Sequence, residues 1–209
     1  MVPDGDDPIA ARAARYSAAQ RRTADVALEL FAEHGVAGTS LQMIADRLGV
    51  TKAAVYHQFR SKESIVVAVL DVRLVPLEAA VDRAEAAGAT PSARRELLSS
   101  IVHAVVVDRT AWSTLQADPV LLRLLGEHGP SRELWSRLFR VLVGDDHRPA
   151  GRVRAAVLSA ALGAVSHPFV DDLADDQLAA ELLPILSELA GIAPPHRGRR
   201  TAPAEPSDR

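Results

Sequence analysis

Apolar residues recur along this chain at the three- and four-residue intervals of an α-helix, and the alternation typical of a β-strand is almost absent. The clearest case lies in the segment 41–48, where Leu41, Ile44, Ala45 and Leu48 fall at positions i, i+3, i+4 and i+7. Glycine and proline interrupt the pattern between successive segments. The pattern therefore predicts an all-α fold of about nine helices.

Capping signals place the starts of the first four predicted helices, each at a hydroxyl residue: Ser17, Thr39, Thr51 and Ser61. In the second, Thr39 pairs with Gln42 as a capping box, and Gly49 ends the helix. Val50 and Val55 flank the third cap and are expected to pack together as a hydrophobic staple. The fourth helix is long, and Pro76 inside it is expected to kink it.

Five more helices are predicted beyond residue 88, over residues 90–109, 118–126, 129–144, 149–166 and 178–190. The helices fall into a smaller group and a larger group, flanked by segments that lack helical periodicity. We therefore divide the chain into a flexible arm (1–16), a three-helix unit (17–60), a helical bundle (61–192) and a disordered tail (193–209).

Composition narrows the class of protein further. The chain has no cysteine, which excludes disulfides, thiolate metal sites and cysteine nucleophiles and fits a reducing compartment. Its acidic start lacks the apolar core of a signal peptide, and its longest apolar stretch, 155–165, is too short to span a bilayer. These features predict a cytoplasmic protein.

The formal net charge of −3 is unevenly distributed. Residues 9–75 carry nine Lys and Arg against six Asp and Glu, whereas residues 76–209 carry 15 against 18. A modestly basic N-terminal region is thus joined to an acidic remainder. This asymmetry is compatible with binding to a polyanion but does not establish it.

The segment 39–59 has the pattern of a helix-turn-helix, in which Gly49 supplies the tight turn between two short helices. The residues expected in its core are Leu41, Ile44, Leu48, Val50, Val55 and Phe59. The residues that then project outward from the second helix are Lys52, Ala53, Ala54, Tyr56 and His57. Small alanines let a helix approach the major groove closely, and the polar side chains can contact phosphates or base edges. A helical hairpin with a solvated outer face is the alternative.

Residues 17–70 resemble the DNA-binding domain of the tetracycline-repressor-like (TetR) family of bacterial regulators. The matching elements are Ala27-Leu28-x-Leu30-Phe31-x-x-x-Gly35, Thr39-Ser40-x-x-x-Ile44-Ala45, Leu48-Gly49-Val50-Thr51-Lys52, Ala53-Ala54-Val55-Tyr56-His57-Gln58-Phe59 and Ser61-Lys62-Glu63. The resemblance implies a homodimer that binds a palindromic operator in double-stranded DNA, with the third helix in the major groove and an effector pocket in a divergent C-terminal domain. Ala53 and Gln58 depart from the commonest family residues, glycine and histidine, which affects operator preference.

The resemblance also assigns roles to single residues. Thr51, Tyr56 and His57 match phosphate-contacting positions, and Lys52, Ala53 and Ala54 match positions that approach bases. The remaining expected DNA contacts are Ser40, Gln42 and Lys62. Four N-terminal arginines are either an extension of this surface or ordinary solvated charges: Arg12, Arg15, Arg21 and Arg22.

The bundle 61–192 is expected to hold a small, mainly apolar effector and to form the dimer. The expected ligand-binding residues are Ser99, His103, Trp112, Leu115, Gln116, Trp135, Phe139 and His167. A small-residue stripe and a leucine face are expected to form the dimer interface: Ala156, Ser159, Ala160, Gly163, Ala164, Leu178, Leu182, Ile185, Leu186 and Leu189. Packing of the same faces inside one chain is the alternative.

A ligand-responsive repressor is the favoured function, and an activator of the same fold is the alternative. Aspartates near His167 and the run 145–147 resemble metal ligands, but helix junctions favour solvated turns, so no metal or cofactor is expected. No GxSxG, HExxH or phosphate-binding glycine loop occurs. A helical-bundle enzyme, or an adaptor that does not bind DNA, therefore ranks behind a regulator.

Overall fold

The computed structural model describes residues 15–144 and 148–192, which form ten α-helices, two short 3₁₀ turns and no strand. The N-terminal group comprises α2 (Ala18–Gly38), α3 (Leu41–Leu48) and α4 (Lys52–Gln58). The larger group comprises α5 (Lys62–Ala86), α6 (Pro91–Val107), α7 (Arg109–Ala117), α8 (Pro119–Glu127), α9 (Gly129–Val143), α10 (Pro149–Leu162) and α11 (Asp175–Leu189). The 3₁₀ turns η1 (Gly163–Ser166) and η2 (Pro168–Val170) separate α10 from α11.

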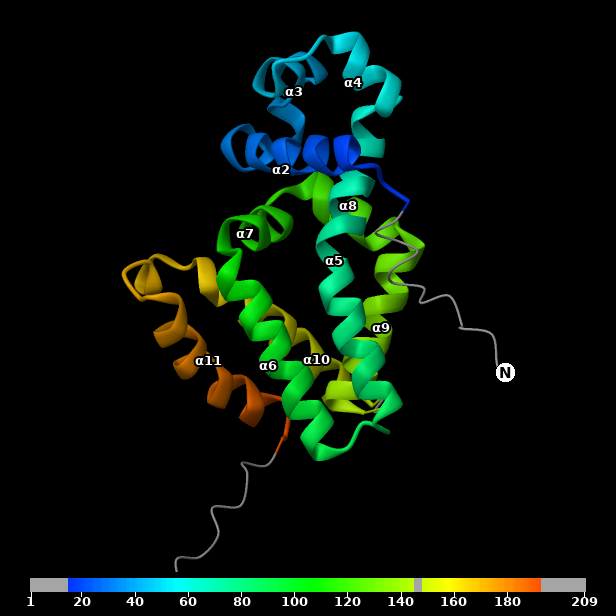
Figure 1. The fold of residues 1–209 in the computed structure, drawn as a ribbon. Coiled ribbons are helices and arrows are strands. Elements are labelled where there is room, and N and C mark those ends of the chain that lie inside the picture. Colours follow the sequence, from blue (N-terminus) through cyan, green and yellow to red (C-terminus); the bar gives the residue numbers. More distant parts are fainter. Residues whose placement is uncertain (1–14, 145–147, 193–209) are drawn as a thin grey trace, which may run out of the picture.

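The helices form two tiers joined by α5 (Figure 1). Helices α2, α3 and α4 lie together at one end of the molecule, and α5 extends from this end into the bundle. Within the bundle α5 packs against α6 and α9, while α11 packs mainly on α6. The arrangement leaves α3 and α4 at the far end of the small tier, where a partner can reach them.

Polar contacts fasten the small tier to α5. The Lys62 ammonium donates to the backbone oxygens of Val36 and Thr39, at 2.6 and 3.0 Å. Arg73 pairs with Asp25 of α2 and with Asp108 at the start of α7, both at 3.1 Å. The predicted boundary between residues 60 and 61 falls in the turn before α5, and these contacts join the helices on its two sides.

Most predicted helix starts coincide with observed caps, but two are wrong: the last helix, expected from Leu178, begins at Asp175, and the cap of α3 is not the predicted residue. The hydroxyls of Ser17, Thr51 and Ser61 each accept a backbone N–H of the first turn that follows. The cap of α3, however, is Ser40 and not Thr39, because the Ser40 hydroxyl accepts the Met43 N–H. The Thr39 hydroxyl instead donates to backbone oxygens of α2, so the predicted capping box is absent.

Three further expectations are wrong in detail. The segment expected to be one helix over 90–109 ends at Val107, and a separate helix, α7, follows it. The helix expected over 149–166 ends at Leu162 and continues as the turn η1. Val50, expected in the core, is 42% exposed, whereas Ile44, Val55 and Phe59 are buried. Helix α5 continues through Pro76 as one element, and the kink expected at this residue stays a prediction.

Some predicted features lie outside the described residues. These are most of the arm, with Arg12, the whole tail and the run 145–147. Among the helices that the structure describes, none combines the length and apolar character needed to cross a membrane.

Candidate DNA-binding surface and ligand cavity

Helices α3 and α4 form a helix-turn-helix with a tight turn at Gly49. Gly49 has φ 69° and ψ 32°, a left-handed conformation that is costly for residues with a Cβ. The backbone N–H of Val50 then donates to the Ala45 oxygen, and Thr51 opens α4 by accepting the Ala54 N–H at 3.2 Å. The local sequence thus determines the angle between the two helices.

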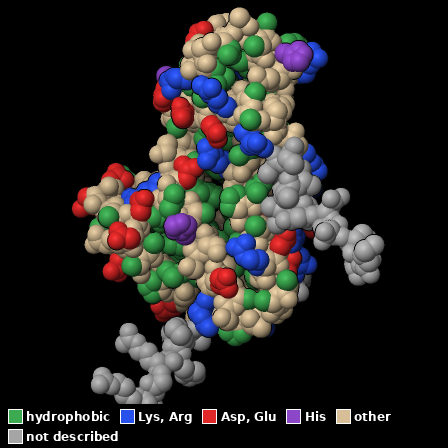
Figure 2. Space-filling view, viewed as in Figure 1, with side chains coloured by type: hydrophobic (Ala, Val, Ile, Leu, Met, Phe, Trp, Pro, Cys, Tyr) green, Lys and Arg blue, Asp and Glu red, His purple; other side chains and the backbone are tan. Residues whose placement is uncertain are grey.

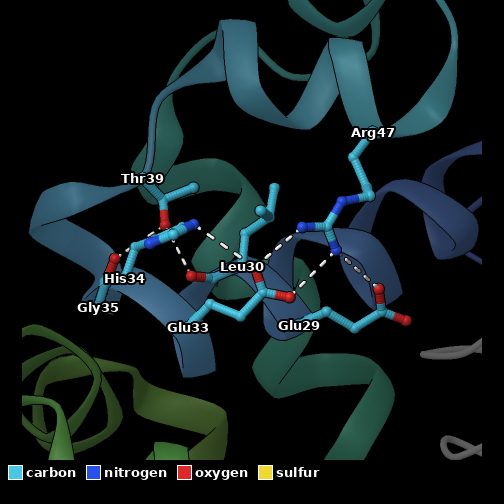
Figure 3. Close-up of polar contacts among 7 residues, drawn as sticks. All are labelled: Glu29, Leu30, Glu33, His34, Gly35, Thr39 and Arg47. Carbon is cyan, nitrogen blue, oxygen red and sulfur yellow. Dashed lines mark hydrogen bonds and ion pairs between the residues drawn. The ribbon is translucent and has the colours of Figure 1, made fainter.

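Polar contacts hold α3 on α2 (Figure 3). The Arg47 guanidinium donates to both carboxylate oxygens of Glu33, at 2.9 and 3.2 Å, and lies 3.7 Å from Glu29. At the other end of α3, the Thr39 hydroxyl lies 2.8 Å from the Gly35 oxygen and 3.1 Å from the Leu30 oxygen. Sequence reasoning did not identify Arg47 and Glu33 as a pair, because they lie on different helices.

The Arg47–Glu33 pair predicts a pH effect. The hydrogen bond from Arg47 lowers the pKa of Glu33 below its ordinary value of 4.5. The contribution of the pair to stability is therefore present above the ordinary pKa and is lost as the pH falls through the lowered one. We expect Arg47→Gln to return the Glu33 pKa toward 4.5 in a carboxyl-carbon NMR titration. An unchanged midpoint in the variant would contradict this assignment.

The outer face of α4 presents the side chains that the sequence placed there. Lys52, Ala53, Tyr56 and His57 are exposed, and Ala54 is half-buried, whereas Val55 points into the core. No ion pair or hydrogen bond engages the Lys52 side chain among the residues that the structure describes. Lysine and arginine side chains also flank this end of the molecule in the view of Figure 2, and acidic side chains gather on the α11 side.

Arg60 belongs to the same face and was missed from the sequence. Its guanidinium carbon lies 5.8 Å from the centre of the Tyr56 ring, a cation–π distance. Arg60 lies beyond the end of α4, so helical spacing in the sequence gives no signal for this contact. The pair places a positive charge over the Tyr56 ring.

The other side chains expected to contact DNA already form hydrogen bonds within the chain. The Lys62 ammonium has three backbone acceptors, with Ala37 as the third at 3.3 Å, so all its donors are in use. The Gln42 amide donates to Asp46 at 2.7 Å, and both side chains are exposed. The Ser40 hydroxyl caps α3 and is exposed. Lys62 therefore acts as an internal anchor, and we leave it out of the proposed surface.

The bundle holds a partly open cavity of about 480 Å³. Five of the expected ligand-binding residues line it, namely Trp112, Leu115, Gln116, Trp135 and Phe139. The other three, Ser99, His103 and His167, are exposed and do not line it. Residues of α5, α6, α8 and α10 complete the wall: Leu74, Leu77, Ile101, Val105, Leu122, Leu125, Ala156, Ser159, Ala160 and Leu162.

The expected dimer residues separate into two sets. Leu178, Leu182 and Leu186 are buried within the single chain, so the leucine face of α11 packs intramolecularly and is not free to meet a partner. In contrast, Ile185 is 56% exposed, and Ala156, Ser159, Ala160 and Ala164 are exposed along α10 and η1. Gly163 and Leu189 are half-buried.

An exposed apolar patch remains on α10 and α11. It consists of Val153, Ala156, Val157, Ala160 and Ile185, of which Ala156 and Ala160 also line the cavity, and we call it the α10–α11 patch. The two helices are in contact, and Val157 is 46% exposed. Sequence reasoning missed Val153 and Val157 because it selected small residues for close approach, whereas the exposed face of α10 also carries valines.

One aspartate near His167, Asp175, forms an ion pair within the fold. Asp175 pairs with Arg109 at 2.7 Å, and His167 packs against the Phe169 ring and accepts its backbone N–H. Among the described residues, no three His, Asp or Glu side chains are grouped to hold a metal ion.

By sequence, the N-terminal part of the chain matches a protein family and individual regulators. Residues 24–69 match the family of bacterial regulatory proteins, tetR family. Over 66 residues the chain is 42% identical to the HTH-type transcriptional regulator SrpR of Pseudomonas putida, covering 32% of this chain and 31% of SrpR. Over 72 residues it is 38% identical to the HTH-type transcriptional regulator RutR of Escherichia coli K12, covering 32% and 34%. The alignments thus span about a third of each relative, including the helix-turn-helix.

Solved structures extend the likeness to both tiers. A TetR-like transcriptional regulator from Rhodococcus sp. RHA1 is similar with a TM-score of 0.63 at 21% identity, covering 84% of this chain and 98% of that one. NalD, the secondary repressor of the MexAB-OprM multidrug efflux pump in Pseudomonas aeruginosa, has a TM-score of 0.58 at 23% identity, covering 81% and 94%. At these identities the likeness concerns the fold.

Proposed function

We propose that this chain, whose residues 24–69 match the tetR family of bacterial regulatory proteins, is a DNA-binding regulator of transcription that acts as a homodimer. The observation that carries the proposal is the outer face of α4, where a free lysine, two alanines and two polar aromatic side chains follow the N-terminus of the helix. This end of a helix favours phosphate binding through its free N–H groups and its dipole.

In the proposed complex α4 enters the major groove of an operator. Lys52, Ala53 and Ala54 meet base edges, where the alanine methyl groups suit thymine and the ammonium suits guanine. Around them, a second set contacts phosphates and sets the register: Ser40, Gln42, Thr51, Tyr56, His57 and Arg60. The Arg60–Tyr56 contact supports this set, because the guanidinium holds charge where the DNA backbone passes.

We assign dimerisation to the α10–α11 patch. An isologous contact across this patch would relate the two copies of α4 by a two-fold axis. Two recognition helices then meet successive major grooves about 34–36 Å apart, so the operator is an inverted repeat. Repression is favoured over activation, since KstR2 of Rhodococcus jostii, to which the chain is 36% identical over 66 residues, is named as a transcriptional repressor.

Variants of α4 should separate base readout from backbone contacts. We expect His57→Ala and Tyr56→Phe to weaken binding to operator and random DNA alike. Lys52→Ala should weaken operator binding by about 1–3 kcal/mol, and this loss should depend on the base at one position of each half-site. Fluorescence anisotropy at fixed salt, with the operator and its single-base variants, measures both. Equal losses for Lys52→Ala on operator and random DNA would reassign Lys52 to the backbone.

The cavity supports a second part of the proposal, namely release of DNA by a small, mainly apolar effector. Helix α5 carries Leu74 and Leu77 on the cavity wall and Lys62 at its end against α2. Helix α7 carries Trp112 on the same wall and is followed by Asp118, which accepts the Val36 N–H at 2.7 Å. A ligand that moves α5 relative to α7 therefore acts on these two attachments of the small tier.

This coupling predicts reciprocal effects of ligand and DNA. A compound that quenches the fluorescence of the two tryptophans should loosen operator binding about tenfold if it favours the DNA-incompetent state by about 1.4 kcal/mol. Operator DNA must then weaken binding of that compound by the same factor. Titration of the compound into the preformed complex tests this. If saturating compound leaves the DNA affinity unchanged, the cavity binds ligands without controlling DNA.

A further inference from the structure

Helix α4 is held in place mainly at its two ends. It has seven residues, of which only Val55 is buried, and Phe59 directly after it is buried as well. At its start, the tight turn at Gly49 sets its direction relative to α3. A helix this short has little stability of its own. The contacts at its C-terminal end therefore decide how it is oriented on α2.

Gln58, the last residue of α4, forms two hydrogen bonds with α2. The Thr23 hydroxyl donates to the Gln58 amide oxygen at 3.0 Å. The Gln58 backbone oxygen, one of the last carbonyl groups of α4, accepts the Gln20 amide N–H at 3.3 Å. Gln20 in turn accepts the Ser17 backbone N–H at 3.0 Å in the capping box of α2. Both the side chain and the backbone of Gln58 thus tie the end of α4 to the start of α2.

Thr23 is too deeply buried to contact DNA. Its residue surface is 1% exposed, and its hydroxyl also lies 3.0 Å from the Ala19 oxygen of its own helix. Gln58 is half-buried, whereas Tyr56 and His57 on the outer face of α4 are exposed. An effect of the Thr23 hydroxyl on DNA binding must therefore pass through Gln58 and α4.

The orientation of α4 matters most at the end that is expected to meet the bases. Lys52 stands six residues before Gln58, about 9 Å away along the helix axis, so a tilt at the Gln58 end displaces the Lys52 end. Hydrogen bonds to base edges require close distances and good alignment. Contacts with phosphates depend more on charge and are made in the same way on any sequence. A tilt of α4 therefore weakens binding to an operator more than binding to random DNA.

We propose that Gln58, held by the buried Thr23 hydroxyl, is a positioning residue for DNA recognition. The pair fixes the orientation of α4 on α2 and so contributes to sequence specificity without touching a base. This role rests on the proposed function, in which α4 reads the operator. The hydrogen bonds that hold α4 are present in the chain without DNA.

The test uses Thr23→Val, which removes the hydroxyl and keeps the shape of the side chain. The probes are random DNA and the inverted repeat recovered by selection from a random DNA library. We expect the variant to bind the repeat about tenfold more weakly, as loss of one hydrogen bond allows, and random DNA within about twofold of wild type. Thr23→Ser retains the hydroxyl and should retain the affinity. The matched control is Thr114→Val, at a buried threonine of α7 whose hydroxyl also donates four residues back, to Thr110 at 2.7 Å. It should bind both DNAs normally.

Two further measurements identify the pair. Gln58→Met should cause a similar loss on the repeat, and the double variant Thr23→Val/Gln58→Met should bind no more weakly than the weaker single variant, because both changes remove the same contact. In the absence of DNA, the Phe59 N–H, which donates to the Val55 oxygen at 2.9 Å, should exchange with solvent faster in Thr23→Val but not in Thr114→Val.

Several results would overturn the inference. These are unchanged binding of the repeat by Thr23→Val, equal losses on the repeat and on random DNA, a similar loss in Thr114→Val, or additive losses in the double variant. Wild-type protein that recovers no inverted repeat would refute the proposed function. The exchange measurement does not depend on DNA, so unchanged exchange at Phe59 in Thr23→Val would refute the positioning role in either case.

Discussion

Replacing Val157 and Ile185 together with glutamate is expected to give a monomer that binds operator DNA about 10²–10⁴-fold more weakly than the wild-type protein. Both side chains are about half exposed on the α10–α11 patch, so a charge at either position is tolerated in the isolated chain. In a dimer the four carboxylates would be buried together. Because the two half-sites are bound by one dimer, loss of the dimer makes the second contact bimolecular.

Light scattering and DNA binding measure the two parts of this prediction. Wild-type protein should have twice the mass of one chain. The matched control is Val107→Glu, the same change at a valine that is 60% exposed on α6, outside the patch. The control should remain dimeric and bind DNA normally. A dimeric Val157→Glu/Ile185→Glu protein would remove the α10–α11 patch from the interface.

Ala53→Glu is expected to weaken DNA binding on the order of 100-fold or more, because a carboxylate would face phosphates in each half-site. The same change should leave the melting temperature unchanged or slightly higher. Ala53 is exposed in the first turn of α4, where glutamate is a good helix former and interacts favourably with the helix dipole. Stability and DNA affinity thus change independently, which a folding defect would not produce.

The neutral variant Ala53→Gln has nearly the same size and isolates the charge. We expect it to bind DNA much more tightly than Ala53→Glu, in anisotropy titrations at the same salt concentration. Similar losses for the two variants would show that the groove rejects a longer side chain rather than a negative charge.

The helix ends that could be predicted are those set by partners a few residues away. Ser17, Thr51 and Ser61 each cap a helix through an N–H three residues later, so the sequence contains the whole interaction. At Thr39 and Ser40 two adjacent hydroxyls compete for the cap. The Thr39 hydroxyl donates instead to the oxygens of Gly35 and Leu30, four and nine residues back on α2. These contacts depend on how the chain turns after α2, which the capping pattern does not show.

The break between α6 and α7 was missed for a similar reason. Asp108 caps α7 through the Ala111 N–H and also pairs with Arg73 of α5. From the sequence, Asp108 reads as one polar residue within a continuing helix. The position of α7 matters because it carries three cavity residues, Trp112, Leu115 and Gln116.

The aromatic residues of the cavity could be predicted from the sequence, whereas most of its aliphatic residues could not. Trp112, Trp135 and Phe139 are rare side chains in this chain and do line the cavity. Leu74 and Leu77 also line it, but their spacing on α5 is that of any buried leucine. His103 was selected for polarity and is exposed, because helical periodicity alone did not show which face of α6 meets the core.

The most direct test of the account is to select sequences from a random double-stranded DNA library with the purified wild-type protein. A homodimer that reads DNA through α4 should enrich an inverted repeat whose half-site centres lie about 10 base pairs, or a multiple of one helical turn, apart. Ala53→Glu protein, carried through the same rounds, should enrich nothing. Recovery of sequences without an inverted repeat, or equal enrichment by the two proteins, would contradict the account.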